Sequence, residues 1–196
     1  MGTRLTYSEL PEGDLKQALY RDLDDFISWY ESIGNRYPAE IDYELLEKLH
    51  ELSNSSTQQE QNSSEFIDDW ALVYLGEYCD FGPGNIKDVT DSSALNIRNY
   101  ESERRIISSG FDREILLLWD FMILGRSLAQ KERYISNKDI FRFAQFSEGE
   151  CQKLYSVLTD SFDISTSEKF NKIPAIGSVI HAIKHKKWPG LLVKVA

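Results

Sequence analysis

The stretch REILLLWDFMILGRSLAQ, residues Arg113 to Gln130, is the most apolar part of this 196-residue chain. Its apolar side chains cover two faces of a helix, with Ile115, Leu118, Trp119 and Met122 on one and Leu117, Phe121 and Leu124 on the other. A helix that is apolar nearly all round is buried. Asp112 is a suitable residue to cap its first turn. The sequence therefore predicts a central helix over residues 112–130.

Asp120 interrupts the apolar run between Ile115 and Leu124. A carboxylate inside a buried helix must find a partner or have a raised pKa, and the sequence leaves both outcomes open for Asp120. The run is also too short to span a bilayer, and the sequence predicts no membrane segment.

Apolar residues recur at steps of three and four in most of the remaining chain. These steps predict further helices over residues 14–33, 42–52, 65–79, 94–108, 147–158 and 174–187. Ser147 and Glu150 have the spacing of a capping box that opens the 147–158 helix, and Ser165 and Glu168 repeat this spacing before a short helix. Residues 138–146 fit a short helix or strand, and residues 191–196 fit a strand or an extended strap. With at most two strand candidates, we expect an all-α fold: a single-domain bundle of about seven or eight helices around the 112–130 helix, with a short terminal strand as an option.

A chain of this length is the size of one domain, so we expect residues 1–196 to form a single helical domain. The segment SNSSTQQEQNSS, residues 53–64, has no large apolar residue and predicts a flexible loop. Residues 80–93 include Gly82-Pro83-Gly84 and predict a long irregular loop, which makes them a candidate binding feature.

Charge is distributed unevenly. The formal net charge is −10, yet the segment 169–196 holds six lysines and no acidic residue. An acidic body repels phosphates and attracts basic protein surfaces, so we expect a basic protein partner and no nucleic acid. A helix-turn-helix drawn over residues 139–158 would put Glu148 and Glu150 where phosphate contacts are needed, which supports this exclusion.

The segment HAIKHKKWPG, residues 181–190, has two histidines one helical turn apart. A zinc protease would need a glutamate directly after His181, but Ala182 stands there, and the 169–196 segment offers no carboxylate as a further ligand. Positive residues at a helix end interact favourably with the helix dipole, which is the simpler interpretation. We expect no metal site and no cofactor.

No catalytic residue is predicted. Cys79 and Cys151 each stand beside acidic residues, which disfavour a thiolate. The Asp80-Phe81-Gly82 triplet lacks the other kinase motifs, and the glycines near Lys87 lack the rest of a phosphate-binding loop. The first residues carry Arg4 and Glu9 without an apolar stretch, so we expect no targeting signal and a cytoplasmic location.

Two groups of carboxylates are the main candidates for partner binding. They are Asp22, Asp24 and Asp25 on the first predicted helix, and Glu65, Asp68 and Asp69 on the third. Such groups also occur as plain solvated helix faces, and this interpretation stays open. The leading hypothesis is an immunity, antitoxin or inhibitor protein that binds and neutralises a basic partner, such as a toxin.

An alternative hypothesis is a helical enzyme that depends on a ligand or metal. Its pocket would lie near Trp70, Tyr74, Asp120 and the 80–93 loop, because aromatic residues and a glycine-containing loop occur together there. A third hypothesis is a structural subunit of a larger assembly.

Overall fold

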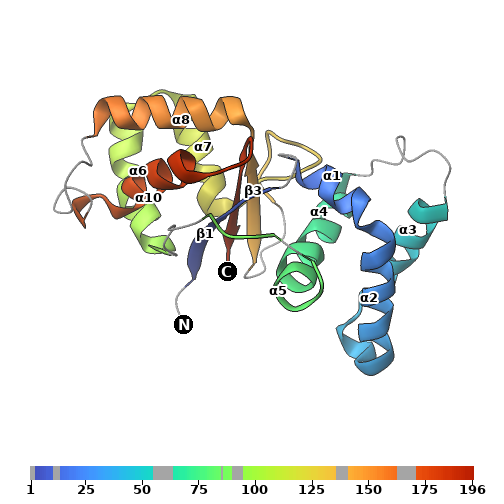
Figure 1. Cartoon of the computed structure of the whole chain (residues 1–196). Coiled ribbons are helices and arrows are strands. Elements are labelled where there is room, and N and C mark those ends of the chain that lie inside the picture. Colours follow the sequence, from blue (N-terminus) through green and yellow to red (C-terminus); the bar gives the residue numbers. More distant parts are fainter. Residues whose placement is uncertain are drawn as a thin grey trace. The chain divides into compact units, whose positions relative to one another are not determined.

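The computed structural model describes residues 3–10, 14–54, 64–84, 86–89, 95–135, 141–162 and 171–196 (Figure 1). The chain forms two compact units. Unit 1 comprises Met1–Asp14, Lys87–Ser127 and Lys131–Ala196, and unit 2 comprises Leu15–Ile86 and Leu128–Gln130. The sequence-based expectation of one domain stays a prediction.

Unit 1 contains a four-stranded antiparallel sheet. Its strands are β1 (Arg4–Ser8), β2 (Leu95–Asn96), β3 (Arg142–Phe146) and β4 (Leu191–Val195), in the order β2-β1-β4-β3. Val193 of β4 pairs with Tyr7 of β1 on one side and with Ala144 of β3 on the other. All five residues of β4 are buried, so the end of the chain forms an inner strand.

The described helices of unit 1 gather on one side of these strands (Figure 1). They are α6 (Ile97–Gly110), α7 (Arg113–Leu124), α8 (Glu148–Ser161) and α10 (Pro174–His185). Their apolar faces and the inner residues of the sheet share one core cluster. Trp119 and Met122 of α7 have no exposed surface, which confirms that this helix is buried.

The expected all-α fold is wrong, because unit 1 combines helices with a sheet. Each long strand has only five residues, and its pairing partner is distant in sequence. A strand this short gives little periodic signal, and hydrogen bonding between the two ends of a chain leaves no local pattern. The central helix therefore packs against a sheet and not only against other helices.

The central helix is also shorter than the predicted range 112–130. It ends at Leu124 because Gly125 has a φ of 79°, in the left-handed region that favours glycine. A Cβ at Gly125 would lie 3.1 Å from the carbonyl oxygen of Phe143. At the other end the prediction is confirmed, since the Asp112 side chain accepts a hydrogen bond of 2.9 Å from the Ile115 N–H.

Two local features that the sequence singles out are present in unit 1, and for Asp120 the structure shows the first of the two expected outcomes. Asp120 has a partner: Arg104 donates to its two oxygens at 2.5 and 2.7 Å. Ser147 and Glu150 form the reciprocal capping box that opens α8. A similar spacing at residues 165–168 lies outside the described residues.

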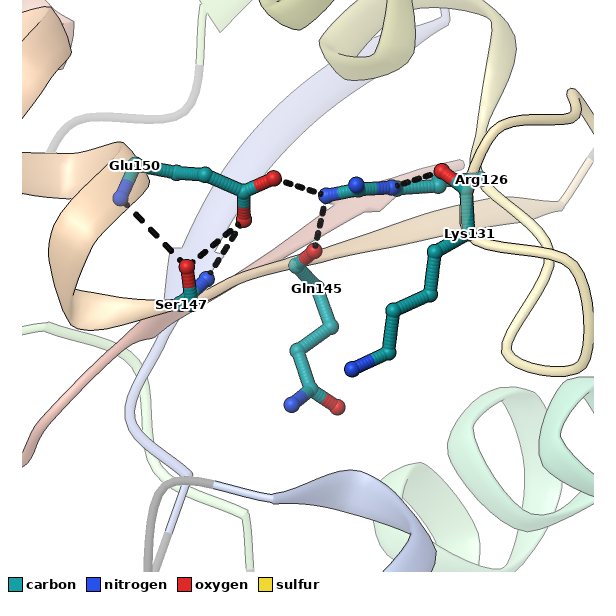
Figure 2. A network of polar contacts seen from close by, with 5 residues as sticks. All are labelled: Arg126, Lys131, Gln145, Ser147 and Glu150. Atoms are coloured by element: carbon teal, nitrogen blue, oxygen red, sulfur yellow. Dashed lines mark hydrogen bonds and ion pairs between the residues drawn. The ribbon is translucent and has the colours of Figure 1, made fainter.

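Arg126 forms a network of hydrogen bonds at the edge strand β3 in unit 1 (Figure 2). Its guanidinium donates to the carbonyl oxygens of Lys131 at 2.5 Å and Gln145 at 3.2 Å, and it pairs with Glu150 at 2.8 Å. The backbone N–H of Arg126 also donates to Phe143, at 2.7 Å. The arginine therefore satisfies backbone acceptors of an edge strand, which is a structural role.

The basic segment 169–196 is an integral part of unit 1. Beyond residue 170, where its description begins, it supplies α10 and β4. Lys186 pairs with Glu148, and Lys194, which is only 8% exposed, lies 3.9 Å from Asp88. Lys184 and His185 occupy the last turn of α10, as the helix-end interpretation predicts.

Unit 2 is helical in its described part. It contains α1 (Leu15–Arg21), α2 (Leu23–Arg36), a 3₁₀ turn (Pro38–Glu40), α3 (Tyr43–Asn54), α4 (Ser64–Val73), a π-helical turn (Tyr74–Tyr78) and α5 (Cys79–Phe81). Its core includes a cluster of aromatic rings centred on Phe26, whose centroid lies 5.5 Å from Tyr30, 6.0 Å from Tyr74 and 5.3 Å from Tyr78.

The two predicted loops are described only in part. Residues 55–63 of the 53–64 segment lie outside the described residues, and so do 85 and 90–93 of the 80–93 segment. Val89 donates from its N–H to the Tyr7 carbonyl at 2.9 Å, so the 80–93 segment contributes pairing to the sheet of unit 1. Among the helices that the structure describes, none has both the length and the apolar character needed to cross a membrane.

Candidate ligand-binding site

A pocket of about 480 Å³ opens on unit 2. Its lining residues are Arg21, Asp22, Asp25, Tyr78, Pro83 and Gly84. The end of α1 and the start of α2 supply the charged residues, while the π-helical turn and the glycine-containing segment after α5 supply the rest. The pocket therefore combines one cation, two carboxylates and an aromatic ring.

Asp22 stands at the break between α1 and α2. The sequence predicts one helix here, but the structure divides it at Asp22, whose φ of −96° and ψ of 9° are outside the helical range. Arg21 donates to the two Asp22 oxygens at 2.7 and 3.0 Å, and the Tyr74 hydroxyl donates at 2.5 Å. Burial acts to raise the pKa of Asp22, but these hydrogen bonds and the Arg21 charge together hold it below its ordinary value.

The π-helical turn positions Tyr74 and Tyr78. The Cys79 N–H bonds to the Tyr74 carbonyl, the five-residue step that defines this rare conformation. Short π-helical segments occur frequently at functional sites. The Tyr78 ring packs edge-on against Phe26 and Trp29, with centroids 5.3 and 5.2 Å away, so its position in the pocket wall is well determined.

The negative charges of the pocket carboxylates affect the pKa of Tyr78. Burial, followed by the charges of Asp22 and Asp25, raises the pKa of its hydroxyl. Tyr78 is therefore a neutral hydrogen-bond donor at physiological pH.

The segment Gly82-Pro83-Gly84 folds tightly over Tyr78. The N–H groups of both glycines donate to the Tyr78 carbonyl, at 3.1 Å for Gly82 and 3.0 Å for Gly84. A Cβ at Gly84 would lie only 2.5 Å from the Tyr78 ring, and a Cβ at Gly82 would lie 2.7 Å from the Tyr78 carbonyl oxygen. Both positions therefore require glycine, and the pocket wall is closely packed.

The structure brings two of the six predicted partner-binding carboxylates together, Asp22 and Asp25. Asp24 is exposed and accepts a hydrogen bond of 2.7 Å from Ser53. Asp68 accepts one of 2.7 Å from the Leu128 N–H, and Asp69 is exposed on α4. The side chain of Glu65 lies outside the described part of the chain.

Sequence reasoning missed Arg21 and Tyr78 as pocket residues, whereas Pro83 and Gly84 lie in the 80–93 segment that it named as a candidate binding feature. Tyr78 belongs to the apolar stripe of its helix, and Arg21 looks like an ordinary exposed cation. The pair of glycines around Pro83 was the available signal, because it marks a close approach of the backbone to another group.

The alternative enzyme hypothesis named residues that the structure places in different units. Trp70 and Tyr74 belong to the aromatic core of unit 2 and are 0% and 1% exposed. Asp120 belongs to unit 1 and is engaged by Arg104. None of the three lines the pocket described above, and the enzyme hypothesis stays a prediction.

The His181 and His185 rings stack in unit 1 with centroids 4.2 Å apart. Over the described ranges, no group of three or more histidine, cysteine or acidic side chains is arranged to hold a metal ion. Of the two cysteines, neither of which forms a disulfide, Cys151 is buried, and burial raises the pKa of its thiol to about 12. A thiol with this pKa is a poor nucleophile.

The two units differ sharply in charge. Unit 2 holds 15 acidic and four basic residues, a net charge of −11, whereas unit 1 holds 17 acidic and 18 basic residues, a net charge of +1. The acid excess of the whole chain therefore resides in unit 2. Comparison with known proteins adds no family: no family model, no curated protein and no solved structure matches this chain.

Proposed function

We propose that this protein binds a basic protein partner through the acidic surface of unit 2, as an immunity, antitoxin or inhibitor protein does. The observation that carries the proposal is the segregation of charge: −11 on unit 2 against +1 on unit 1. A concentrated charge of one sign attracts oppositely charged surfaces and raises the rate of productive encounters.

Many acidic side chains of unit 2 are available to solvent. In the part of unit 2 that the structure describes, the exposed acidic residues are Asp24, Asp25, Glu31, Glu40, Asp42, Glu44, Glu47, Glu51, Asp69, Glu77 and Asp80. Among the basic residues of the unit, Arg21 pairs with Asp22 and Lys48 pairs with Glu44. The electrostatic potential produced by the net charge of unit 2 is therefore negative and favours a partner rich in lysine and arginine.

Phe81 adds an apolar contact to this charged surface. Its side chain is 85% exposed, and it directly precedes the Gly82-Pro83-Gly84 wall of the pocket. Aromatic residues are enriched among the few side chains that dominate binding energy at protein interfaces. An exposed phenylalanine beside carboxylates fits a contact area with an apolar centre and charged surroundings.

A matched pair of charge reversals tests the proposal. Glu47→Lys/Glu51→Lys alters the exposed face of α3 in unit 2, and Glu101→Lys/Glu132→Lys makes the same change in net charge on exposed positions of unit 1. The full-length chain is used to capture partners from source cells, and the affinity of each purified partner is measured by titration calorimetry at about 0.05 and 0.2 M salt.

We expect a basic partner whose affinity falls about tenfold or more with the unit 2 reversals and changes less than about twofold with the unit 1 reversals. The affinity should also weaken as salt increases, since exposed charges are screened. Equal effects of the two double variants, or a captured partner without a basic surface, would contradict the proposal.

A further inference from the structure

We infer that the unit 2 pocket binds a guanidinium group, namely an arginine side chain that the basic partner presents. This inference rests on the proposed function and specifies the residue of the partner. Asp25 supplies the charge, and Tyr78 and Pro83 line the pocket with it.

The two carboxylates of the pocket differ in their hydrogen-bond and ion-pair partners. Asp22 already accepts hydrogen bonds from Arg21 and Tyr74. Asp25 is exposed, and no residue in the described part of the chain forms a hydrogen bond or ion pair with it. Asp25 lines the same pocket as Tyr78, and its charge is one cause of the raised pKa of the Tyr78 hydroxyl. Asp25 is therefore the carboxylate that an incoming cation meets.

Arginine fits this pocket better than lysine. A guanidinium is planar, stacks on rings and bonds to a carboxylate through two parallel N–H groups, whereas an ammonium is a compact and strongly hydrated point charge. The pocket already contains one such pair, since Arg21 holds both oxygens of Asp22 at 2.7 and 3.0 Å. A second guanidinium on Asp25 would repeat that paired geometry within the same pocket.

Arg21 opposes the incoming cation. Its guanidinium lines the same pocket, and its side chain is 45% exposed. Two positive charges in one pocket repel each other, so Arg21 reduces the attraction of the two carboxylates for a second guanidinium. Removal of the Arg21 charge should therefore strengthen binding, an effect that a purely structural role of the pocket would not produce.

The probe is N-acetyl-arginine amide, compared with the lysine and citrulline amides. Citrulline has nearly the same shape as arginine but no charge. Binding is followed by fluorine NMR of the full chain labelled with 5-fluorotryptophan, because Trp29 packs against Tyr78 and the Gly82 backbone. The Trp29 signal is one of four and is assigned with Trp29→Phe.

We expect saturable binding of the arginine amide with a Kd of about 1–10 mM, and clearly weaker binding of the lysine and citrulline amides. Asp25→Asn should weaken arginine binding about tenfold, the loss expected for a charge-assisted hydrogen bond. Asp24→Asn is the matched control: it removes the same charge one position away, from a residue that does not line the pocket, and should leave binding unchanged. Arg21→Gln should tighten binding about threefold or more.

Equal binding of arginine and lysine, binding of citrulline as tight as that of arginine, or equal losses in Asp24→Asn and Asp25→Asn would each overturn the inference. Thermal unfolding of every variant confirms that the chain is folded. The result is separable from the proposed function. If arginine fails to bind but partner affinity still depends on the unit 2 reversals, only the inference falls. If arginine binds as expected but partner affinity does not change with the unit 2 reversals, the proposed function is wrong and the assignment of the pocket is retained.

Discussion

Glu103 of α6 accepts a hydrogen bond of 2.9 Å from the backbone N–H of Ala175, at the start of α10. Its second carboxylate oxygen accepts one of 2.8 Å from the Ile176 N–H. α10 begins after Ile173 and has no capping side chain of its own, so a residue 72 positions earlier in the chain caps it. The carboxylate is only 4% exposed, and its negative charge also suits the positive end of the helix dipole.

Glu103→Gln should therefore destabilise the protein by about 1–3 kcal/mol, because an amide group offers only one acceptor oxygen to two buried N–H donors. Urea unfolding measures the loss. Glu101→Gln is the control, since Glu101 is exposed on the same helix and should change the free energy of unfolding by less than about 0.5 kcal/mol. Equal stability of Glu103→Gln and wild type would show that the cap contributes nothing.

Tyr74→Phe should cost about 1–2 kcal/mol of stability, because it removes the 2.5 Å hydrogen bond to Asp22 and leaves a half-buried carboxylate with one donor fewer. Tyr78→Phe is the comparison, since the Tyr78 hydroxyl has no hydrogen-bond partner among the described residues. It should cost less than Tyr74→Phe in the same denaturation experiment. The reverse order would contradict the assigned role of Tyr74.

Stability should fall in acid partly through Asp22. Its pKa in the folded chain is below the ordinary value, so the unfolded chain binds the proton more readily as the pH falls. The stabilisation is fully present above the ordinary carboxyl pKa of about 4 and is lost as the pH decreases through the lower folded value. Asp22→Asn should flatten the dependence of the unfolding free energy on pH between about pH 5 and pH 2. Unchanged acid sensitivity in this variant would be inconsistent with the stabilising hydrogen bonds assigned to the Asp22 carboxylate.

Arg104 and Asp120 should show energetic coupling. Arg104→Met should cost about 1–3 kcal/mol because it leaves the Asp120 carboxylate, 7% exposed, without its ion-pair partner. In that background Asp120→Leu should restore part of the loss, since the unpaired charge is then gone. A double-mutant cycle by chemical denaturation measures the coupling, with Arg105→Met, an exposed neighbour, as the control. Additive effects of the two changes would exclude a significant ion pair.

Gly84→Ala should disrupt the pocket, because its Cβ would lie 2.5 Å from the Tyr78 ring and 2.9 Å from the Tyr78 carbonyl oxygen. We expect loss of arginine-amide binding and a stability decrease of about 1–3 kcal/mol from the forced displacement. Gly149→Ala provides the contrast, since a Cβ there meets nothing within 4 Å and the residue lies in α8. It should stabilise the chain by about 0.5–1 kcal/mol. Retained arginine binding in Gly84→Ala would show that the wall is not closely packed.

Local relationships were predictable from the sequence because both partners lie within one helical turn. The Asp112 cap and the Ser147–Glu150 box are contacts over three residues, and the buried α7 follows from its apolar content. A partner for Asp120 was one of two outcomes that the sequence allowed, and the identity of that partner was not predictable. Arg104 lies on a different helix, and only its packing against α7 places it there.

The pocket was predictable only in part for the same reason. Asp22 and Asp25 are conspicuous as neighbouring carboxylates, but Tyr78 joins them from more than 50 positions away. The sequence also suggests an acidic body with a basic tail. The structure instead places the acid excess in unit 2, whereas the basic segment pairs with acids such as Glu148 in unit 1.

The sequence by itself determined the helices, their caps and the total charge, since these depend on residue type and on spacing along a few turns. Only the tertiary structure decided the β-sheet, the Glu103 cap of α10, the division of charge between the units and the composition of the pocket. Each of these joins segments that are distant in the chain. Such contacts form because the segments bury apolar surface together, and no local pattern in the chain specifies which distant partner is chosen.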